Sequence, residues 1–241
     1  MATVILVRHG RSSANATGVL AGRLPGVKLD ERGHEQAAST AERLATVRLA
    51  SAVSSPLERC KQTARAITAQ QSAQLGLTTE RKLTECDYGD WQGRPLKDLA
   101  KEPLWKIVQS QPSAAAFPGG ESMRAMQDRA VEAVRRHDRL VEEEHGPGAV
   151  WLAVSHGDVI KAILADALGT HLDLFQRIQV DPASVSIVRY TEARPYVLGT
   201  NTSAGDLSWL TPPPSSRRRG KKTADAVVGG GAGPGSAGSS S

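Results

Sequence analysis

The stretch TVILVRHG, residues 3–10, joins an apolar segment to a polar turn. The segment from Thr3 to Val7 contains only β-branched residues and leucine, which predicts a strand buried in the centre of a sheet. The turn after it carries His9 next to a glycine. A second stretch, VWLAVSHG at residues 150–157, repeats the arrangement with His156. The repetition predicts two buried strands that each end in a histidine.

The carboxyl ends of strands in an α/β sheet form the crevice in which ligands bind. Helices that begin there direct backbone N–H groups and the positive end of their dipole at the ligand. One histidine at a strand end is as often a packing or capping residue as a ligand. Two with matching glycine neighbours favour an anion site, and Arg8 and Arg59 strengthen that hypothesis because a guanidinium binds phosphate bidentately. Taken alone, Arg59 would be interpreted as an exposed helix residue.

Apolar β-branched segments alternate with alanine-rich helical stretches along the chain, which favours one α/β domain over residues 1–211. Helices are expected over residues 31–49, 123–144 and 159–168, with one more opened by Ser55-Pro56. Further strands are expected at residues 52–54, 184–190 and 196–200. The segment from Leu83 to Glu85 is interpreted as a strand end before a glycine-rich bend.

Residues 212–241 differ in character from the rest of the chain. They combine a triple proline, a basic cluster and a Gly/Ser-rich end, and are expected to be a disordered tail. Residues 215–241 hold five Lys or Arg and one Asp, a net of 5 − 1 = +4 out of a total of +5. The remainder therefore carries 5 − 4 = +1, so the charge does not predict a nucleic-acid-binding domain. A solvated tail is favoured over one that binds nucleic acid or a membrane surface.

The two cysteines, Cys60 and Cys86, provide neither a disulfide framework nor metal-ligand spacing. The first apolar segment is too short for a signal peptide or a membrane span, so a cytoplasmic protein without membrane contact is expected. No metal ligands cluster in the sequence, because the other histidines are scattered over polar segments: His34, His137, His145 and His171. The oligomeric state is left open, with a homodimer among the options.

Four motifs resemble those of the histidine phosphatase superfamily, which includes the cofactor-dependent phosphoglycerate mutases. They are LVRHG at residues 6–10, with Asn15; SSPLER at residues 54–59; LTE at residues 83–85, followed by GDWQG; and VSHG at residues 154–157. Their order and spacing agree with the family over roughly residues 3–200. The resemblance implies a three-layer α/β/α fold with a mostly parallel central sheet, of the phosphoglycerate mutase type.

The resemblance also implies roles for individual residues. His9 would be the nucleophile that attacks phosphorus, and Glu85 would protonate the leaving oxygen and later activate water. The residues that would hold the phosphoryl group or line its pocket are Arg8, Asn15, Gly22, Arg59, His156 and Gly157. Two arginines and a protonated His156 would supply the positive charge, so neither a metal nor a cofactor is expected. A bound phosphate dianion would help to keep Glu85 protonated.

The sequence departs from the mutases at the positions that bind a substrate carboxylate. Cys86 follows the glutamate where the mutases usually have arginine, and Ala21 replaces a hydroxyl residue. Between residues 96 and 121 the only cations are three lysines, and FPGGES at residues 117–122 resembles the phosphatase branch. Gln92 stands where glutamate is common. Residues 96–122, with Trp105 and Phe117, are expected to form part of the wall over the site.

The favoured hypothesis is a metal-independent phosphoric monoester hydrolase that acts on a small phosphorylated metabolite through a phosphohistidine. A mutase remains the alternative among enzymes. A catalytically idle phosphoprotein-binding module is less favoured, because binding alone would not require Glu85. A cysteine phosphatase is excluded, because Arg must follow the cysteine six positions on, and Ala66 and Gln92 stand there.

Overall fold

The computed structural model describes residues 2–72, 74–203, 228–229 and 231. Its centre is a six-stranded sheet in the order β3-β2-β4-β1-β5-β6. The four strands β1 to β4 run parallel, whereas β5 and β6 are antiparallel additions at one edge. The strands are β1 (Thr3–Arg8), β2 (Ser51–Ser54), β3 (Leu77–Thr79), β4 (Val150–Ser155), β5 (Val185–Arg189) and β6 (Tyr196–Thr202). The predicted α/β fold with a mostly parallel sheet is confirmed.

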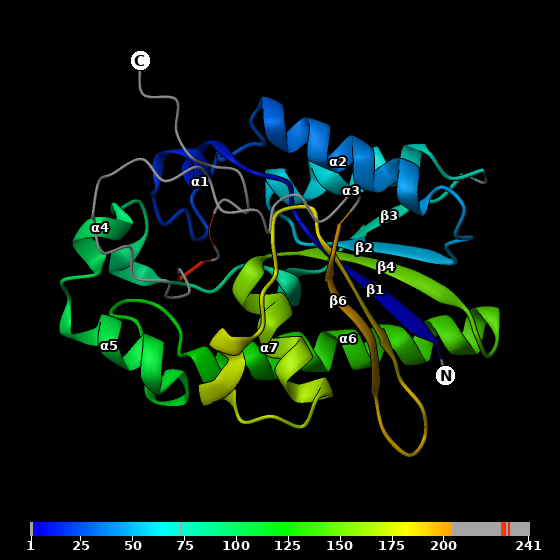
Figure 1. Ribbon diagram of the computed structural model, residues 1–241. Coiled ribbons are helices and arrows are strands. Elements are labelled where there is room, and N and C mark those ends of the chain that lie inside the picture. Colours follow the sequence, from blue (N-terminus) through cyan, green and yellow to red (C-terminus); the bar gives the residue numbers. More distant parts are fainter. Residues whose placement is uncertain (1, 73, 204–227, 230, 232–241) are drawn as a thin grey trace, which may run out of the picture.

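Helices cover both faces of the sheet (Figure 1). One face carries α2 (Glu31–Leu44) and α3 (Glu58–Ala69), and the other carries α6 (Met123–His145) and α7 (Gly157–Ala167). Alternate β1 residues divide between the layers: Ile5 and Val7 pack with α2 and α3, whereas Val4 and Leu6 pack with α6 and α7. The shorter helices are α1 (Ser13–Thr17), α4 (Leu96–Leu99) and α5 (Pro103–Ser110), and single 3₁₀ turns lie at Arg81–Leu83, Gly89–Trp91, Pro112–Ala114 and Leu172–Arg177.

The register between β1 and β4 brings the two histidine turns together. The strands are parallel neighbours in which Val7 pairs with Val154 and Arg8 pairs with Ser155. The residues that follow, His9 and His156, therefore leave the sheet at the same edge and the same height. The sequence predicted both strands but not their adjacency.

Three boundaries expected from the sequence are wrong. The first helix ends at Leu44 rather than 49, because the chain turns there and buries Leu49 on its way to β2. Ser55-Pro56 does not open α3, whose N-cap is Leu57 without a side-chain bond. Residues 83–85 do not end a strand; a 3₁₀ turn occupies Arg81–Leu83, and the unexpected strand β3 precedes it.

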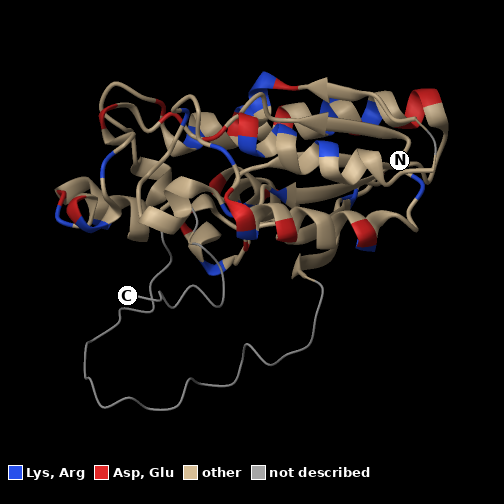
Figure 2. Ribbon diagram, turned by 90° about the horizontal axis from the view of Figure 1, so that it is seen from above, with Lys and Arg blue, Asp and Glu red and all other residues tan. Residues whose placement is uncertain are grey.

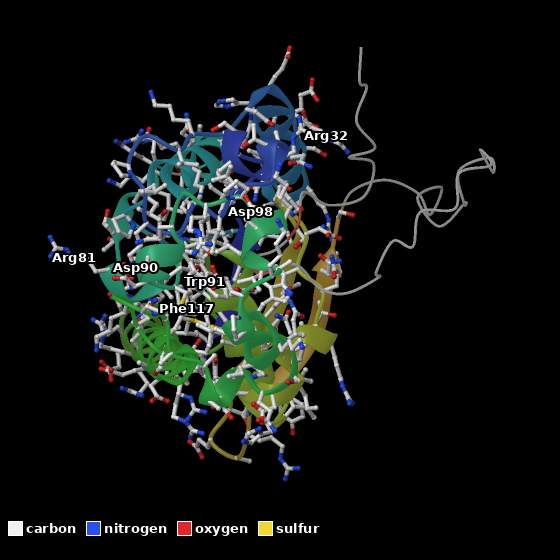
Figure 3. The ribbon with its side chains drawn as sticks, turned by 90° about the vertical axis from the view of Figure 1, so that its left-hand side faces the viewer. Arg32, Arg81, Asp90, Trp91, Asp98 and Phe117 are labelled. Atoms are coloured by element: carbon white, nitrogen blue, oxygen red, sulfur yellow. The ribbon has the colours of Figure 1, made fainter. Side chains whose placement is uncertain are left out.

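Aromatic side chains fill the space between α4–α5 and the sheet. Trp91 and Phe117 lie side by side, with ring centroids 5.3 Å apart (Figure 3). Phe117 also meets Tyr88 edge to face at 4.9 Å, and Trp91 stacks on Trp105 at 6.2 Å. These rings fix the segment that supports the candidate site.

Charged residues of both signs alternate over the helices in the view of Figure 2. In the part of the chain that the structure describes, no helix is long and apolar enough to cross a membrane.

The loop after β1 crosses the first turn of α2 at a close backbone contact between two glycines. A Cβ on Gly33 would overlap the carbonyl oxygen of Arg11, and one on Gly10 would overlap the carbonyl of Gly33. The contact requires glycine on both sides and fixes the turn that carries His9.

Gly33→Ala is expected to lower the free energy of unfolding by about 1–3 kcal/mol, the usual cost of overpacking, even though alanine favours a helix. Urea denaturation monitored by circular dichroism would measure it. Gly76→Ala is the control, because no atom lies within 4 Å of its added Cβ. Equal or greater stability of the Gly33 variant would contradict the close contact.

Candidate active site

The candidate site lies where β1, β2 and β4 end. His9 follows β1 and His156 caps α7 after β4. Both side chains are buried, and their ring centroids are 5.2 Å apart in an edge-on arrangement. The two histidines that the sequence singled out therefore share one site.

Arg59, from the first turn of α3, connects the parts of this site. Its Nε donates to Nε2 of His9 at 3.2 Å, and its Nη2 lies 2.8 Å from the carbonyl oxygen of Gly22 and 3.2 Å from Nδ1 of His156. Its Nη1 is buried and has no hydrogen-bond partner among the described residues. The guanidinium thus retains a donor for a ligand.

The hydrogen bonds of His9 determine which ring nitrogen can react. Nδ1 lies 2.7 Å from the carbonyl oxygen of Gly10, which can only accept, so Nδ1 carries the proton. Nε2 therefore keeps its lone pair, which accepts the hydrogen bond from Arg59 Nε. Burial, followed by the charges of Arg59 and Arg8, lowers the pKa of His9 well below its ordinary value. The ring is neutral near pH 7.

His156 is held in the opposite tautomer. Its Nδ1 accepts from Arg59, so the proton lies on Nε2, 2.8 Å from the hydroxyl oxygen of Ser55. The Ser55 hydroxyl therefore belongs to the site, while the N-cap position of α3 is Leu57. Burial, followed by the charge of Arg59, lowers the pKa of His156 well below its ordinary value. This lowered pKa favours a neutral His156, whereas the expectation of a protonated His156 concerns the protein with a bound phosphoryl group and stays a prediction.

Glu85 is 3% exposed and faces the histidine pair. Its Oε1 accepts from the backbone N–H of Cys86 at 2.9 Å, and its Oε2 lies 3.9 Å from Nδ1 of His156. Burial, followed by the charge of Asp158, raises the pKa of Glu85 to about 7. A carboxyl with that pKa can both give and take a proton at neutral pH.

Two arginines that the sequence analysis missed fix the backbone of Glu85. Its carbonyl oxygen accepts from Arg23 Nε at 2.9 Å and from Arg129 Nη2 at 3.1 Å. Glu121 bonds to both arginines, at 2.8 Å and 2.6 Å. Although burial opposes it, bonding to Arg129 and to the Asp87 N–H lowers the pKa of Glu121. No sequence signal linked these residues, because they lie far from Glu85 along the chain.

The remaining predicted site residues divide into two groups. Asn15 and Gly22 line the cavity, whereas Arg8, His156 and Gly157 are buried and are not among the described residues that line it. Asn15 Oδ1 accepts from Ser12 in a capping box, which leaves its amide nitrogen to donate to a ligand. Gly22 has φ +50, and a Cβ there would collide with the side chain of Gln92. Glycine at this position therefore holds the carbonyl that anchors Arg59.

The cavity over the site has a volume of about 160 Å³. Beyond His9, Arg59 and Glu85, its walls include the apolar residues Val19, Leu20, Ala21 and Leu96. Arg59 is the only Lys or Arg among the described lining residues. From the segment 96–122, only Leu96 contributes, so the expected wall of Trp105 and Phe117 is wrong: these rings pack inside the aromatic cluster.

Most of the expected tail, residues 212–241, lies outside the described residues. The three that are described, Val228, Gly229 and Gly231, line the cavity. The Val228 side chain is 1% exposed within the main core, and the backbone N–H of Gly229 donates to Asp158 Oδ2 at 2.9 Å. Gly229 has φ +75 and approaches Leu20 so closely that a side chain would not fit. These residues form a wall of the cavity.

Within the described ranges, no group of three or more His, Cys, Asp or Glu is arranged to hold a metal ion. The nearby thiol of Cys60 is fully buried, which raises its pKa to about 12 and leaves it un-ionised at neutral pH.

Comparison with known proteins places this geometry in a family context. The model of the histidine phosphatase superfamily, branch 1, matches residues 4–203. Phosphoserine phosphatase 1 of Hydrogenobacter thermophilus is 31% identical over 83% of the chain and 92% of the relative. The probable phosphoglycerate mutase GpmB of Salmonella choleraesuis is 30% identical over 88% and 97%. The α-ribazole phosphatase structure from Shigella flexneri gives a TM-score of 0.72 at 27% identity, covering 85% and 98%.

The wall formed by Val228, Gly229 and Gly231 leads to a prediction about the size of the group that the cavity admits. A chain ending at residue 227 is expected to hydrolyse 1-naphthyl phosphate better relative to glycerol phosphate than the full chain does, with a severalfold rise in KM for the smaller ester. Loss of the wall removes contacts to a small ligand and opens space for a large one.

A chain ending at Gly231 keeps the described wall and is the control, expected to match the full chain. Steady-state kinetics on both esters would measure the ratio. An unchanged ratio after truncation at residue 227 would show that the wall does not limit the cavity.

Proposed function

This chain belongs to the histidine phosphatase superfamily, branch 1, and on that basis we propose that it hydrolyses small phosphate monoesters through a phosphohistidine formed on His9. The single observation that carries the proposal is the state of His9: its ring is neutral and protonated on Nδ1, its Nε2 lone pair accepts from Arg59, and the residue lines the cavity. We assign the catalytic domain to residues 1–211, with Val228, Gly229 and Gly231 adding a wall to its cavity.

In the first step, Nε2 of His9 attacks phosphorus and the bond to the leaving oxygen breaks. The phosphoryl oxygens replace His9 as the partner of Arg59 Nε and bind the unpaired Nη1. Arg8 and Arg59 stabilise the charge on the transferring group. An arriving dianion also favours protonation of His156 at Nδ1, which would then become a further donor.

Glu85 gives its proton to the leaving oxygen in this step and receives one from water in the second. The attacking water then displaces His9 Nε2 from phosphorus, which releases inorganic phosphate and restores the neutral imidazole. A pKa of about 7 suits both directions, because the carboxyl is available as acid and as base at neutral pH. Covalent capture divides hydrolysis into two easier steps.

The charge of the cavity favours a phosphatase over a mutase. A mutase must hold a second anionic group of its substrate, whereas Arg59 is the only cation among the described lining residues and apolar side chains surround the rest. Arg23, which bonds to the Glu85 carbonyl, is also held by Asp87 and Glu121. An idle binding module is disfavoured, because it would not need a buried carboxyl with a raised pKa.

The first prediction of this mechanism concerns the covalent intermediate. Rapid quenching into alkali during turnover of a ³²P-labelled monoester should trap an acid-labile phosphoenzyme, since phosphohistidine survives base. His9→Ala should abolish trapping and turnover, while His34→Ala, at an exposed position, should change neither. Phosphoenzyme that persists in the His9 variant would overturn the assignment.

A second prediction separates the role of Glu85 as an acid from the role of Arg59, which stabilises charge on the phosphoryl group. An alkyl phosphate leaves as a basic alkoxide unless protonated, whereas p-nitrophenyl phosphate leaves as a stable phenolate. Glu85→Gln should therefore slow phosphorylation of His9 by the alkyl ester about 10²–10⁴-fold, and by the nitrophenyl ester far less. Arg59→Ala should slow both similarly, because it acts on the transferring group.

Single-turnover quench-flow isolates the first step, which matters because Glu85 also acts in the second. Equal slowing of both esters in the Glu85 variant would remove Glu85 as the leaving-group acid.

A further inference from the structure

A buried carboxylate that the proposed mechanism does not use lies next to the site. Asp158, in the first turn of α7, is 0% exposed. Its Oδ2 accepts from the Tyr88 hydroxyl at 2.8 Å and from the backbone N–H of Gly229 at 2.9 Å. Its Oδ1 has no hydrogen-bond donor among the described residues. Burying a carboxylate with one oxygen unsatisfied is costly, so a purely structural role explains it poorly.

The positive charge of Lys161 neutralises the Asp158 carboxylate only in part. Lys161 lies one turn further along α7, 3% exposed, with its Nζ 3.8 Å from Asp158 Oδ1. The same Nζ donates to Gln176 Oε1 at 3.0 Å and lies 5.6 Å from the centre of the Phe175 ring. A loose buried pair adds little to stability, since desolvation offsets the attraction. Much of the Asp158 charge therefore acts on other groups nearby.

Tyr88 orients that charge toward the cavity. Its side chain is fully buried, lines the cavity together with Glu85, and is fixed edge to face against Phe117. Because its hydroxyl donates to Asp158, the carboxylate is anchored just behind the wall that carries Glu85. In such a low-dielectric surrounding, a like charge acts strongly on a neighbouring carboxyl.

Groups from every element around Glu85 compete to set its protonation. Arg8 on β1 and Arg59 on α3 favour the ionised form, as does the Cys86 N–H. His156, at the start of α7, is neutral and contributes little. Arg23, in the loop after α1, and Arg129, on α6, are engaged with the Glu85 carbonyl and with Glu121. Burial and Asp158 oppose these cations, and among the charges that raise the pKa of Glu85 the charge of Asp158 has the largest effect.

We propose that Asp158 is a positioning residue for this reaction: its anchored carboxylate helps to keep the proton on Glu85 against the positive charges of Arg8 and Arg59. Burial and Asp158 together offset these positive charges, which favour the ionised carboxyl. The inference rests on the proposed role of Glu85 and adds a group that acts through it rather than on substrate.

The test is the alkaline limb of the pH profile of kcat/KM with an alkyl phosphate. That limb reports loss of the Glu85 proton, so it should disappear in Glu85→Gln. Asp158→Asn removes a negative charge, favours ionised Glu85, and should move the limb to lower pH by about one unit. Asp166→Asn makes the same change on the same helix, where Asp166 pairs with Arg135 near the surface, and should leave the limb in place.

Loss of Asp158 alone leaves Lys161 buried and unpaired, which threatens folding. Asp158→Asn/Lys161→Met removes both charges and should shift the limb in the same direction. Infrared titration of the protonated carboxyl band, assigned by its loss in Glu85→Gln, gives a readout independent of turnover. Both variants should lower the midpoint of that band.

The outcomes distinguish the two proposals. If Glu85→Gln abolishes the limb but the Asp158 variants leave limb and infrared midpoint unchanged, Asp158 has only a structural role and this inference is wrong. If Glu85→Gln keeps the limb, the acid assignment fails. The infrared midpoint would still decide whether Asp158 controls Glu85.

Discussion

The Arg59 guanidinium is the constraint on which the rest of the site depends. Its hydrogen bonds join His9 after β1, the carbonyl of Gly22 in the following loop, and His156 after β4. A planar fork of donors can satisfy these groups simultaneously and still keep one N–H for a ligand. Lysine could not, because it offers a single point charge. The sheet register and the loop carrying Gly22 are thereby coupled through one side chain.

Burial makes the charges of this site depend on each other. Desolvation and the arginines keep both histidines neutral, whereas desolvation and Asp158 raise the pKa of Glu85 to about 7. Near neutral pH the positive charge that lines the cavity is therefore that of Arg59, with the buried Arg8 outside the lining, and both charges favour a phosphate dianion. The low dielectric constant makes this arrangement costly, and it also strengthens the interaction of each charge with the others.

The contacts that fix Glu85 come from segments outside the motif that contains it. The motif predicted that Glu85 belongs to the site, but its backbone carbonyl is fixed by Arg23 and Arg129, which Glu121 holds in turn, and that motif includes none of the three. Their chain separation from Glu85 is large, and each alone resembles an ordinary surface residue. Val228 and Gly229 were hidden for a similar reason, since the composition of their segment predicts disorder.

The sequence by itself determined the α/β class, the two buried strands that end in His9 and His156, and the family, because apolar periodicity and short motifs are local properties. It placed the start of α3 wrongly at Ser55-Pro56, since the N-cap is Leu57 and the Ser55 hydroxyl bonds to His156 from a remote segment. Only the tertiary structure decided which tautomer each histidine adopts, which charges face Glu85 and which residues close the cavity. Those properties depend on burial and on distances between segments remote in sequence, and no local pattern encodes them.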